Sequence, residues 1–143
     1  MGILLNHANV STERFAAAIE RVNACLPQGC ASLKLSPSFS SSYSSCKAST
    51  MMVFVLTYSK CVFHDLLSPT DYLLWCRFVE CCEVYFAKEL TLDLINFVEK
   101  HYTLFLERFI SMFPDHSINF NFHLCLHIPE TLRLFGPSYT SWW

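Results

Sequence analysis

Residues 69 to 88 constrain the fold most, because they predict a helix that is apolar on nearly every side. Ser68 suits the N-cap, Pro69 the first helical position and Asp71 the first turn, so the start of the helix is well marked. A helix of this kind lies in the middle of a body larger than itself. Two apolar rows leave only a narrow charged strip, and they consist of Tyr72, Trp75, Cys76, Val79, Cys82 and Phe86, and of Leu74, Phe78, Cys81 and Tyr85.

The composition of the whole chain extends the same argument. Of the 143 residues 52% are hydrophobic and 15% are charged, whereas an ordinary soluble domain has about 25% charged residues. A chain of this length can form one domain, but so few charges leave little polar surface to cover it. We therefore expect a partner, or further polypeptide of a larger chain, to cover part of its surface.

Charge and hydrophobicity also bear on the class of protein. The net charge is -2, and Lys and Arg never form a cluster of more than two neighbours, whereas a protein that binds nucleic acid by itself usually has a basic stripe. The longest apolar run, residues 51 to 56, is far shorter than the roughly 18 residues of a membrane span. The start of the chain does not resemble a signal peptide. These features predict an intracellular protein, nuclear or cytoplasmic, that is neither secreted nor embedded in a membrane.

Eight cysteines occur without any C-x-x-C pair, so neither a zinc ribbon nor a thioredoxin-like motif can be drawn. Cys61, Cys76 and Cys82 lie among apolar neighbours at helical spacing, where a free cysteine behaves as a small hydrophobic residue. The pattern favours reduced, buried thiols.

The chain as a whole predicts a mainly α fold, with an irregular N-terminal third followed by about four helices. Residues 1 to 35 hold a short helix over 11 to 25 and an irregular segment, and the serine-rich residues 36 to 50 predict a loop or linker. Residues 51 to 143 form a helical domain that is incomplete at its C-terminus. Within it, helices are expected over 50 to 67, 69 to 88 and 91 to 113, although M-M-V-F-V-L at the start of the first also suits a buried strand.

Residues 118 to 128 alternate strictly between apolar and polar side chains. By period alone this pattern predicts a strand. Pro129 also weakens any single helix through the region, because proline has no amide hydrogen to donate to Cys125. We nevertheless favour a loop to about Asn121 followed by a helix, and this preference rests on a resemblance to a known family rather than on the period.

The resemblance lies in the pattern N-x-H-x-x-x-H-I followed by G-P-x-x-x-x-W. It resembles the C-terminal part of CACTA-type (En/Spm-like) transposases, and weaker matches extend the likeness back to about residue 21. In this family a helix follows the histidines and an aromatic-Pro-Phe-Glu-Arg motif follows the tryptophan. The matching residues here are Asn121, His123, His127, Ile128, Gly136, Pro137 and Trp142.

The resemblance implies a fragment of a metal-dependent DNA transposase, a helical region of an RNase H-like protein. Such enzymes hold two divalent metal ions, usually Mg²⁺, between carboxylates. The Phe-Glu-Arg motif and the last catalytic acid of the family would come after Trp143. The fragment would therefore have no catalytic activity and no cofactor of its own, would reach DNA only through the parent protein, and would have the remainder of the transposase as its partner. The alternative is a helical protein-interaction module that docks through its apolar helices.

The aspartates agree with a region that has no catalytic site. Strand-borne aspartates in βαβ units would mark a nuclease core of this type, and none is found in the pattern. Instead the aspartates fall at predicted helix starts, helix ends or turns, where capping and the helix dipole account for them. They are Asp65, Asp71, Asp93 and Asp115.

His123 and His127 form the candidate metal-binding or structural pair of the chain. On a helix the two side chains lie one turn apart and can grip a metal ion, as in zinc sites. Leu124 follows His123 in place of the glutamate of an H-E-x-x-H motif, and Cys125 points away from the pair on a helix. The sequence therefore favours structural histidines over metal ligands.

Overall fold

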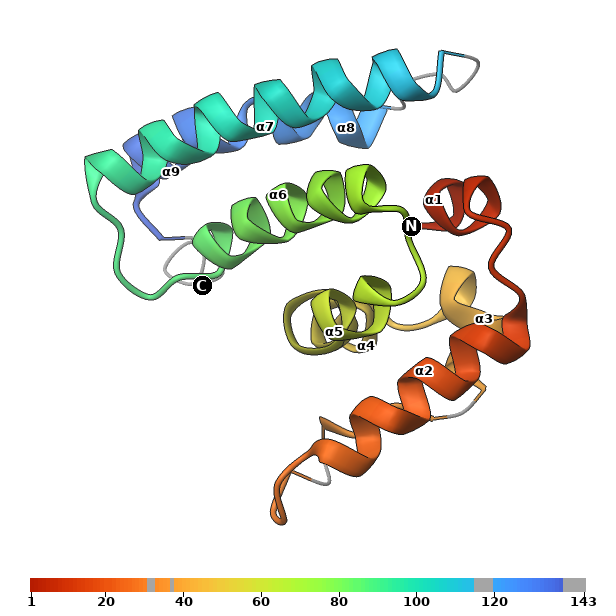
Figure 1. Ribbon diagram of the computed structural model, residues 1–143. Coiled ribbons are helices and arrows are strands. Elements are labelled where there is room, and N and C mark those ends of the chain that lie inside the picture. The colour runs from red at the N-terminus through yellow and green to blue at the C-terminus, as the bar shows by residue number, and fades with distance from the viewer. Residues whose placement is uncertain (31–32, 37, 115–119, 138–143) are drawn as a thin grey trace. The chain divides into compact units, whose positions relative to one another are not determined.

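The computed structural model describes every residue except 31–32, 37, 115–119 and 138–143 (Figure 1). Across that part of the chain the regular secondary structure is helical and no strand occurs, which confirms the expected mainly α fold. Two compact units follow each other, Met1–Leu73 and Leu74–Trp143, and their boundary falls inside α6 (Pro69–Tyr85). The sequence pattern places its boundaries at residues 35 and 50.

The first unit begins with helices on either side of a short turn. The helix expected over residues 11 to 25 is confirmed. The Ser11 hydroxyl caps its start by accepting the Arg14 N–H at 3.3 Å. The helix at the very N-terminus was not predicted. In order, the elements of this unit ahead of α6 are α1 (Gly2–His7), α2 (Thr12–Cys25), α3 (Phe39–Ser42), η2 (Tyr43–Ser45), α4 (Ala48–Val53), η3 (Phe54–Tyr58) and α5 (Ser59–His64).

The serine-rich segment is partly helical, which corrects the expectation of a loop or linker over residues 36 to 50. The hydroxyls of Ser41 and Ser42 donate to the Ser38 carbonyl at 3.0 and 2.8 Å, so the serines satisfy the backbone of the short helix α3. Phe39 is only 3% exposed, and its ring lies 4.9 Å from that of Phe54. Phe39, together with Tyr43, whose ring lies 6.2 Å from that of Phe15, thus fixes a segment whose serine content predicted a loop or linker.

Residues 48 to 64 form one continuous helical stretch, so the strand alternative for M-M-V-F-V-L is wrong. Its middle, η3, is a π-helix, and the Ser59 hydroxyl donates to the Val55 carbonyl at 2.6 Å just after it. A π turn changes the facing of the residues that follow it. Phe54 and Tyr58, at the two ends of η3, are both completely buried.

The core of the first unit combines an aromatic cluster with one buried polar link. The ring of Phe15 lies 5.8 Å from Phe54 and 6.0 Å from Phe63. Beside this cluster the side-chain amide of Asn23 donates to the Leu35 carbonyl at 3.0 Å and accepts the Leu35 N–H at 3.2 Å. Asn23 therefore pairs with both backbone groups of Leu35, whose N–H also donates to the Tyr58 hydroxyl at 3.3 Å, and it holds the loop after α2 in place.

The second unit comprises the rest of α6 together with α7 (Leu92–Met112), α8 (Phe120–Cys125) and α9 (Ile128–Phe135). The predicted helices over 69 to 88 and 91 to 113 are confirmed, although α6 ends at Tyr85. Thr91 caps α7 by accepting the Leu94 N–H at 3.2 Å. None of the helices in the described ranges is long and apolar enough to cross a membrane.

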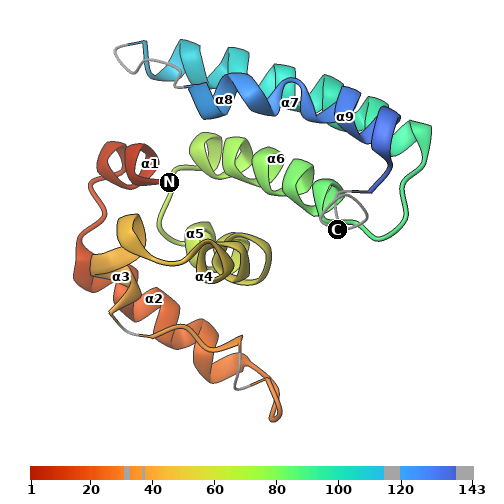
Figure 2. The same ribbon diagram turned by 180° about the vertical axis from the view of Figure 1, so that it is seen from behind.

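The conflict over residues 118 to 128 is resolved in favour of helix for the residues that can be described, which start at 120. The alternating pattern does not follow burial, because Leu124 and Leu126 are both about two-fifths exposed, at 45% and 40%. A turn at residues 126–127 separates α8 from α9, as the proline at position 129 led us to expect. Both views show α8 and α9 lying alongside α7 (Figures 1 and 2).

Candidate functional site

The two histidines of the family pattern meet at the junction of α8 and α9. His123 lies in α8 and His127 is the N-cap residue of α9, and both are exposed. Their Nε2 atoms are 3.4 Å apart, and their ring centroids are 5.1 Å apart at an interplanar angle of 77°. The helix expected to carry both residues is interrupted between α8 and α9, but the two side chains still lie next to each other, with their Nε2 atoms facing.

Local backbone bonds create this arrangement. The N–H groups of Leu126 and His127 donate to carbonyls three residues back, each at 3.0 Å, which tightens the end of α8. The His127 carbonyl then accepts the Thr131 N–H at 3.1 Å and opens α9. Pro129 stands in the first turn of α9, where its missing N–H costs nothing. The proline thus separates the two helices and leaves a histidine on each side of the break.

Two buried tyrosines donate hydrogen bonds to backbone carbonyls of α8, the helix that carries His123. The Tyr102 hydroxyl donates to the Phe122 carbonyl at 3.3 Å, and the Tyr85 hydroxyl donates to the Cys125 carbonyl at 3.4 Å. Burial raises the pKa of both tyrosines well above the usual value. Both hydroxyls therefore keep their protons and remain hydrogen-bond donors. Their two bonds fix the position of the α8 backbone, and with it the start of the His123 side chain.

The remaining residues of the pattern follow along α9. Gly136 ends that helix with φ 75° and ψ -161°, and its N–H donates to the Leu132 carbonyl at 3.0 Å. Only glycine adopts this combination of angles without strain. Pro137 comes next and cannot continue a helix. Asn121 belongs to α8 but its side chain lies outside the described part of the structure, as does all of Trp142.

Within the described ranges no group of three or more His, Cys, Asp or Glu side chains is placed to hold a metal ion. Asp71 and Asp93 stand in the first turns of their helices and Asp65 directly follows α5, as expected. Asp115 lies outside the described residues. Burial raises the pKa of Cys81 and of Cys82 to about 12, so both thiols are protonated at neutral pH and neither is an activated nucleophile.

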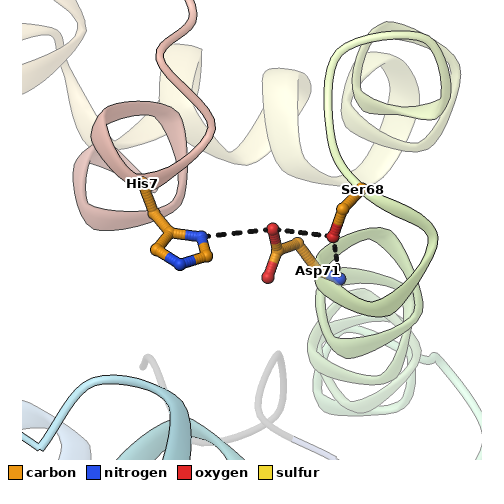
Figure 3. A network of polar contacts seen from close by, with 3 residues as sticks. All are labelled: His7, Ser68 and Asp71. Carbon is orange, nitrogen blue, oxygen red and sulfur yellow. Dashed lines mark hydrogen bonds and ion pairs between the residues drawn. The ribbon is translucent and has the colours of Figure 1, made fainter.

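A second polar constellation lies in the first unit, and the sequence predicted only its helix cap. The carboxylate of Asp71 is almost fully buried, and one of its oxygens accepts a hydrogen bond from the Ser68 hydroxyl at 2.9 Å (Figure 3). The same oxygen lies 3.3 Å from Nδ1 of His7. In return the Ser68 hydroxyl accepts the Asp71 N–H at 3.2 Å. His7 of α1 and Ser68, just before α6, thus both contact the buried carboxylate of Asp71.

The order of the bonds differs from that of a nucleophilic triad. In such a triad the imidazole stands between serine and carboxylate and takes the proton of the serine. Here the carboxylate stands between serine and histidine, so His7 is not placed to take the proton of Ser68. The sequence predicted the capping part of the network, with Ser68 at the N-cap and Asp71 in the first turn, and the bond from the Asp71 N–H to Ser68 confirms it. No local signal points to His7, because it lies 64 residues away in the sequence.

Comparisons with protein-family models, curated proteins and solved structures find no match for this chain.

Proposed function

We propose that this chain is a helical region of a CACTA-type (En/Spm-like) transposase, which precedes the last catalytic acid of the family and has no catalytic activity by itself. The observation that carries the proposal is the fit between the family pattern and the α8–α9 segment. The two histidines of the pattern face each other across one turn. The glycine of the pattern occupies a backbone conformation that only glycine adopts readily.

The rest of the proposed role follows from the resemblance and the charge of the chain. Membership of an RNase H-like protein is part of the proposal and rests on the resemblance. In the parent protein the carboxylates that bind Mg²⁺ would belong to other segments. The net charge of -2 gives no general attraction to phosphate, so DNA would be held by the parent protein. The region would then act inside the cell as a packing element for the remainder of the transposase.

The most direct test is the DNA on the 3′ side of the codon for Trp143. The proposal expects codons, in any reading frame, for an aromatic-Pro-Phe-Glu-Arg-like motif shortly after that position. Flanking DNA that encodes no such motif in any frame would contradict it. This test uses neither folding nor purification, so a poorly behaved protein cannot obscure the answer.

A biochemical test addresses the lack of catalytic activity. We expect the purified chain to leave supercoiled plasmid intact in the presence of Mg²⁺ or Mn²⁺, because the metal-binding acids would lie elsewhere in the parent protein. Nicking that stays with the chain through successive purification steps, and that stops when EDTA is added, would contradict the proposal.

A second candidate function, a helical module that docks on another protein, is favoured by the apolar side chains that point outward. Leu92 of α7 is 69% exposed, and Leu134 and Phe135 of α9 are 70% and 66% exposed. Side chains of this kind on adjacent helices are common where another protein binds. The flanking DNA separates the two functions, since the docking module requires no transposase-like continuation.

A further inference from the structure

The geometry of the histidine pair suggests a property that does not depend on the proposed function. We propose that His123 and His127 form a two-histidine binding site for a divalent transition metal ion such as Zn²⁺, which links the end of α8 to the start of α9. Both side chains are exposed, so an ion can reach them from solvent. The distance between the two Nε2 atoms is 3.4 Å.

That distance matches tetrahedral zinc. Zinc binds imidazole nitrogen at about 2.0–2.1 Å, and two such bonds at a tetrahedral angle place the two nitrogens about 3.3–3.4 Å apart. An ion therefore fits between the rings with little movement of either side chain. Sequence spacing alone gave only the single turn between the residues; the facing of the two Nε2 atoms is what the structure adds.

The two histidines can exchange the hydrogen bond between their rings for a metal ion. In the hydrogen bond between the rings, one Nε2 carries the proton and the other accepts it. When a metal binds, the ring that carried its proton on Nε2 changes tautomer: it loses that proton to water and takes one up from water on Nδ1, so that both neutral rings hold their proton on Nδ1 and direct an Nε2 lone pair to the ion. The step replaces one N–H···N hydrogen bond by two metal–nitrogen bonds, displaces water from the hydrated ion and releases no net proton.

Imidazole ligands also decide the class of metal. They suit Zn²⁺, Cu²⁺ and Ni²⁺, whereas Mg²⁺ and Ca²⁺ prefer oxygen ligands. The proposed ion is therefore distinct from the Mg²⁺ implied for the parent family. Since no third ligand stands near the pair in the described part of the chain, a four-coordinate ion would keep two positions for water or for ligands from another molecule.

The test is a Zn²⁺ titration of the whole purified chain after metal removal, in competition with a chromophoric chelator. We compare the natural chain with His123→Gln, His127→Gln, the double variant and His64→Gln. His64 is a matched control, because it is exposed at the end of α5 and has no histidine one turn away. All five proteins keep the eight cysteines, so their differences report on the histidines alone.

We expect one zinc equivalent that is bound by the natural chain and by His64→Gln and is lost from the double variant. Each single variant should weaken that equivalent at least about tenfold, a loss already typical for an outer-shell partner of a metal. Zn²⁺ should also raise the melting temperature of the natural chain more than that of the double variant. Equal zinc binding by the natural chain and the double variant, with unchanged helix content, would overturn the proposal.

Discussion

The Ser68 hydroxyl makes two bonds at the start of α6. It accepts the Asp71 N–H at 3.2 Å, as an N-cap does, and it donates to the Asp71 carboxylate at 2.9 Å. Only 2% of Asp71 is exposed, so a lost partner for its carboxylate cannot simply be replaced by water. At this position the serine therefore satisfies both a backbone group and a buried charge.

We predict that Ser68→Ala lowers the free energy of unfolding by about 2 kcal/mol, because it removes a helix cap and a bond to a buried carboxylate. Ser11→Ala is the matched control in the same unit. It removes the exposed cap of α2 and a hydrogen bond to the exposed Glu13 side chain, with no buried carboxylate involved, and should cost about 1 kcal/mol or less. Urea unfolding followed by circular dichroism measures both values. Equal losses in the two variants would show that the bond to Asp71 contributes nothing.

Glu99 and Arg133 link α7 to α9 at the surface. The Arg133 guanidinium donates to the Glu99 carboxylate and to the Asn96 side-chain oxygen. The hydrogen bond from Arg133 to the Glu99 carboxylate is the main cause that lowers the pKa of Glu99. The lowered pKa means that the folded state binds this proton less readily than the unfolded state. The pair therefore stabilises the fold above the unfolded pKa of Glu99, and this contribution is lost as the pH falls through the folded pKa.

We predict that an NMR titration of the Glu99 carboxyl carbon gives a pKa below the usual glutamate value in the natural chain and close to that value in Arg133→Gln. Arg108→Gln, which removes an exposed arginine of α7 itself, should leave the Glu99 pKa unchanged. A normal Glu99 pKa in the natural chain, or the same shift in all three proteins, would mean that the two side chains do not pair in solution.

At the scale of elements, α9 depends on the way in which it ends. Its last backbone bond runs from the Gly136 N–H to the Leu132 carbonyl at 3.0 Å, and Gly136 then turns the chain with φ 75° and ψ -161°. A side chain at this position meets backbone strain whatever space surrounds it. The glycine is therefore required by the helix end, independently of any ligand.

We predict that Gly136→Ala costs about 1–3 kcal/mol of stability, the usual strain at such a backbone conformation. Gly2→Ala is the control. Gly2 begins α1, and a Cβ there would approach only the end of the Tyr43 side chain, at 3.2 Å, so the change should cost less than about 1 kcal/mol. Thermal unfolding of both variants decides the matter, and a stability of Gly136→Ala equal to that of the natural chain would contradict the described helix end.

The elements that could be predicted are those that local chemistry determines. Ser68 and Thr91 mark helix starts because a cap acts within three residues of itself. Over residues 118 to 128 the alternation by itself indicates a strand, because exposed leucines at 124 and 126 imitate a half-buried strand; the helix found from residue 120 agrees with the resemblance. Tertiary packing decided the rest. The π turn of η3 and the short helix α3 depend on buried aromatic side chains from distant segments, which no local pattern reveals.

In the candidate site, too, the sequence predicted what local spacing determines and missed what depends on tertiary structure. The one-turn spacing of the histidines followed from the resemblance, because a helix fixes the relation of residues four apart. The distance and facing of their Nε2 atoms depend on the short turn between α8 and α9 and could not be obtained from spacing. The link from His7 to Asp71 joins segments 64 residues apart, and only the folded chain brings them together.

At the scale of the whole molecule, each unit has a core of its own, yet large apolar side chains remain outside it. In the second unit most of them lie on α7 and α9, which pack against each other, and the others are Phe86, Leu124 and Leu126. Scattered exposed residues are normal, but several on neighbouring helices are typical of a surface that another polypeptide covers. On α7 and α9 the most exposed are Leu92, Leu134 and Phe135, followed by Ile110, Leu104 and Leu94.

We propose that further polypeptide, of the same or another chain, covers these outward apolar residues. Size-exclusion chromatography with light scattering, combined with binding of the dye ANS, tests it on the purified chain. We expect ANS binding and association that increases with concentration, and we expect both to be reduced in Leu134→Glu at unchanged helix content. A natural chain that stays monomeric at all concentrations and binds no ANS would contradict the claim.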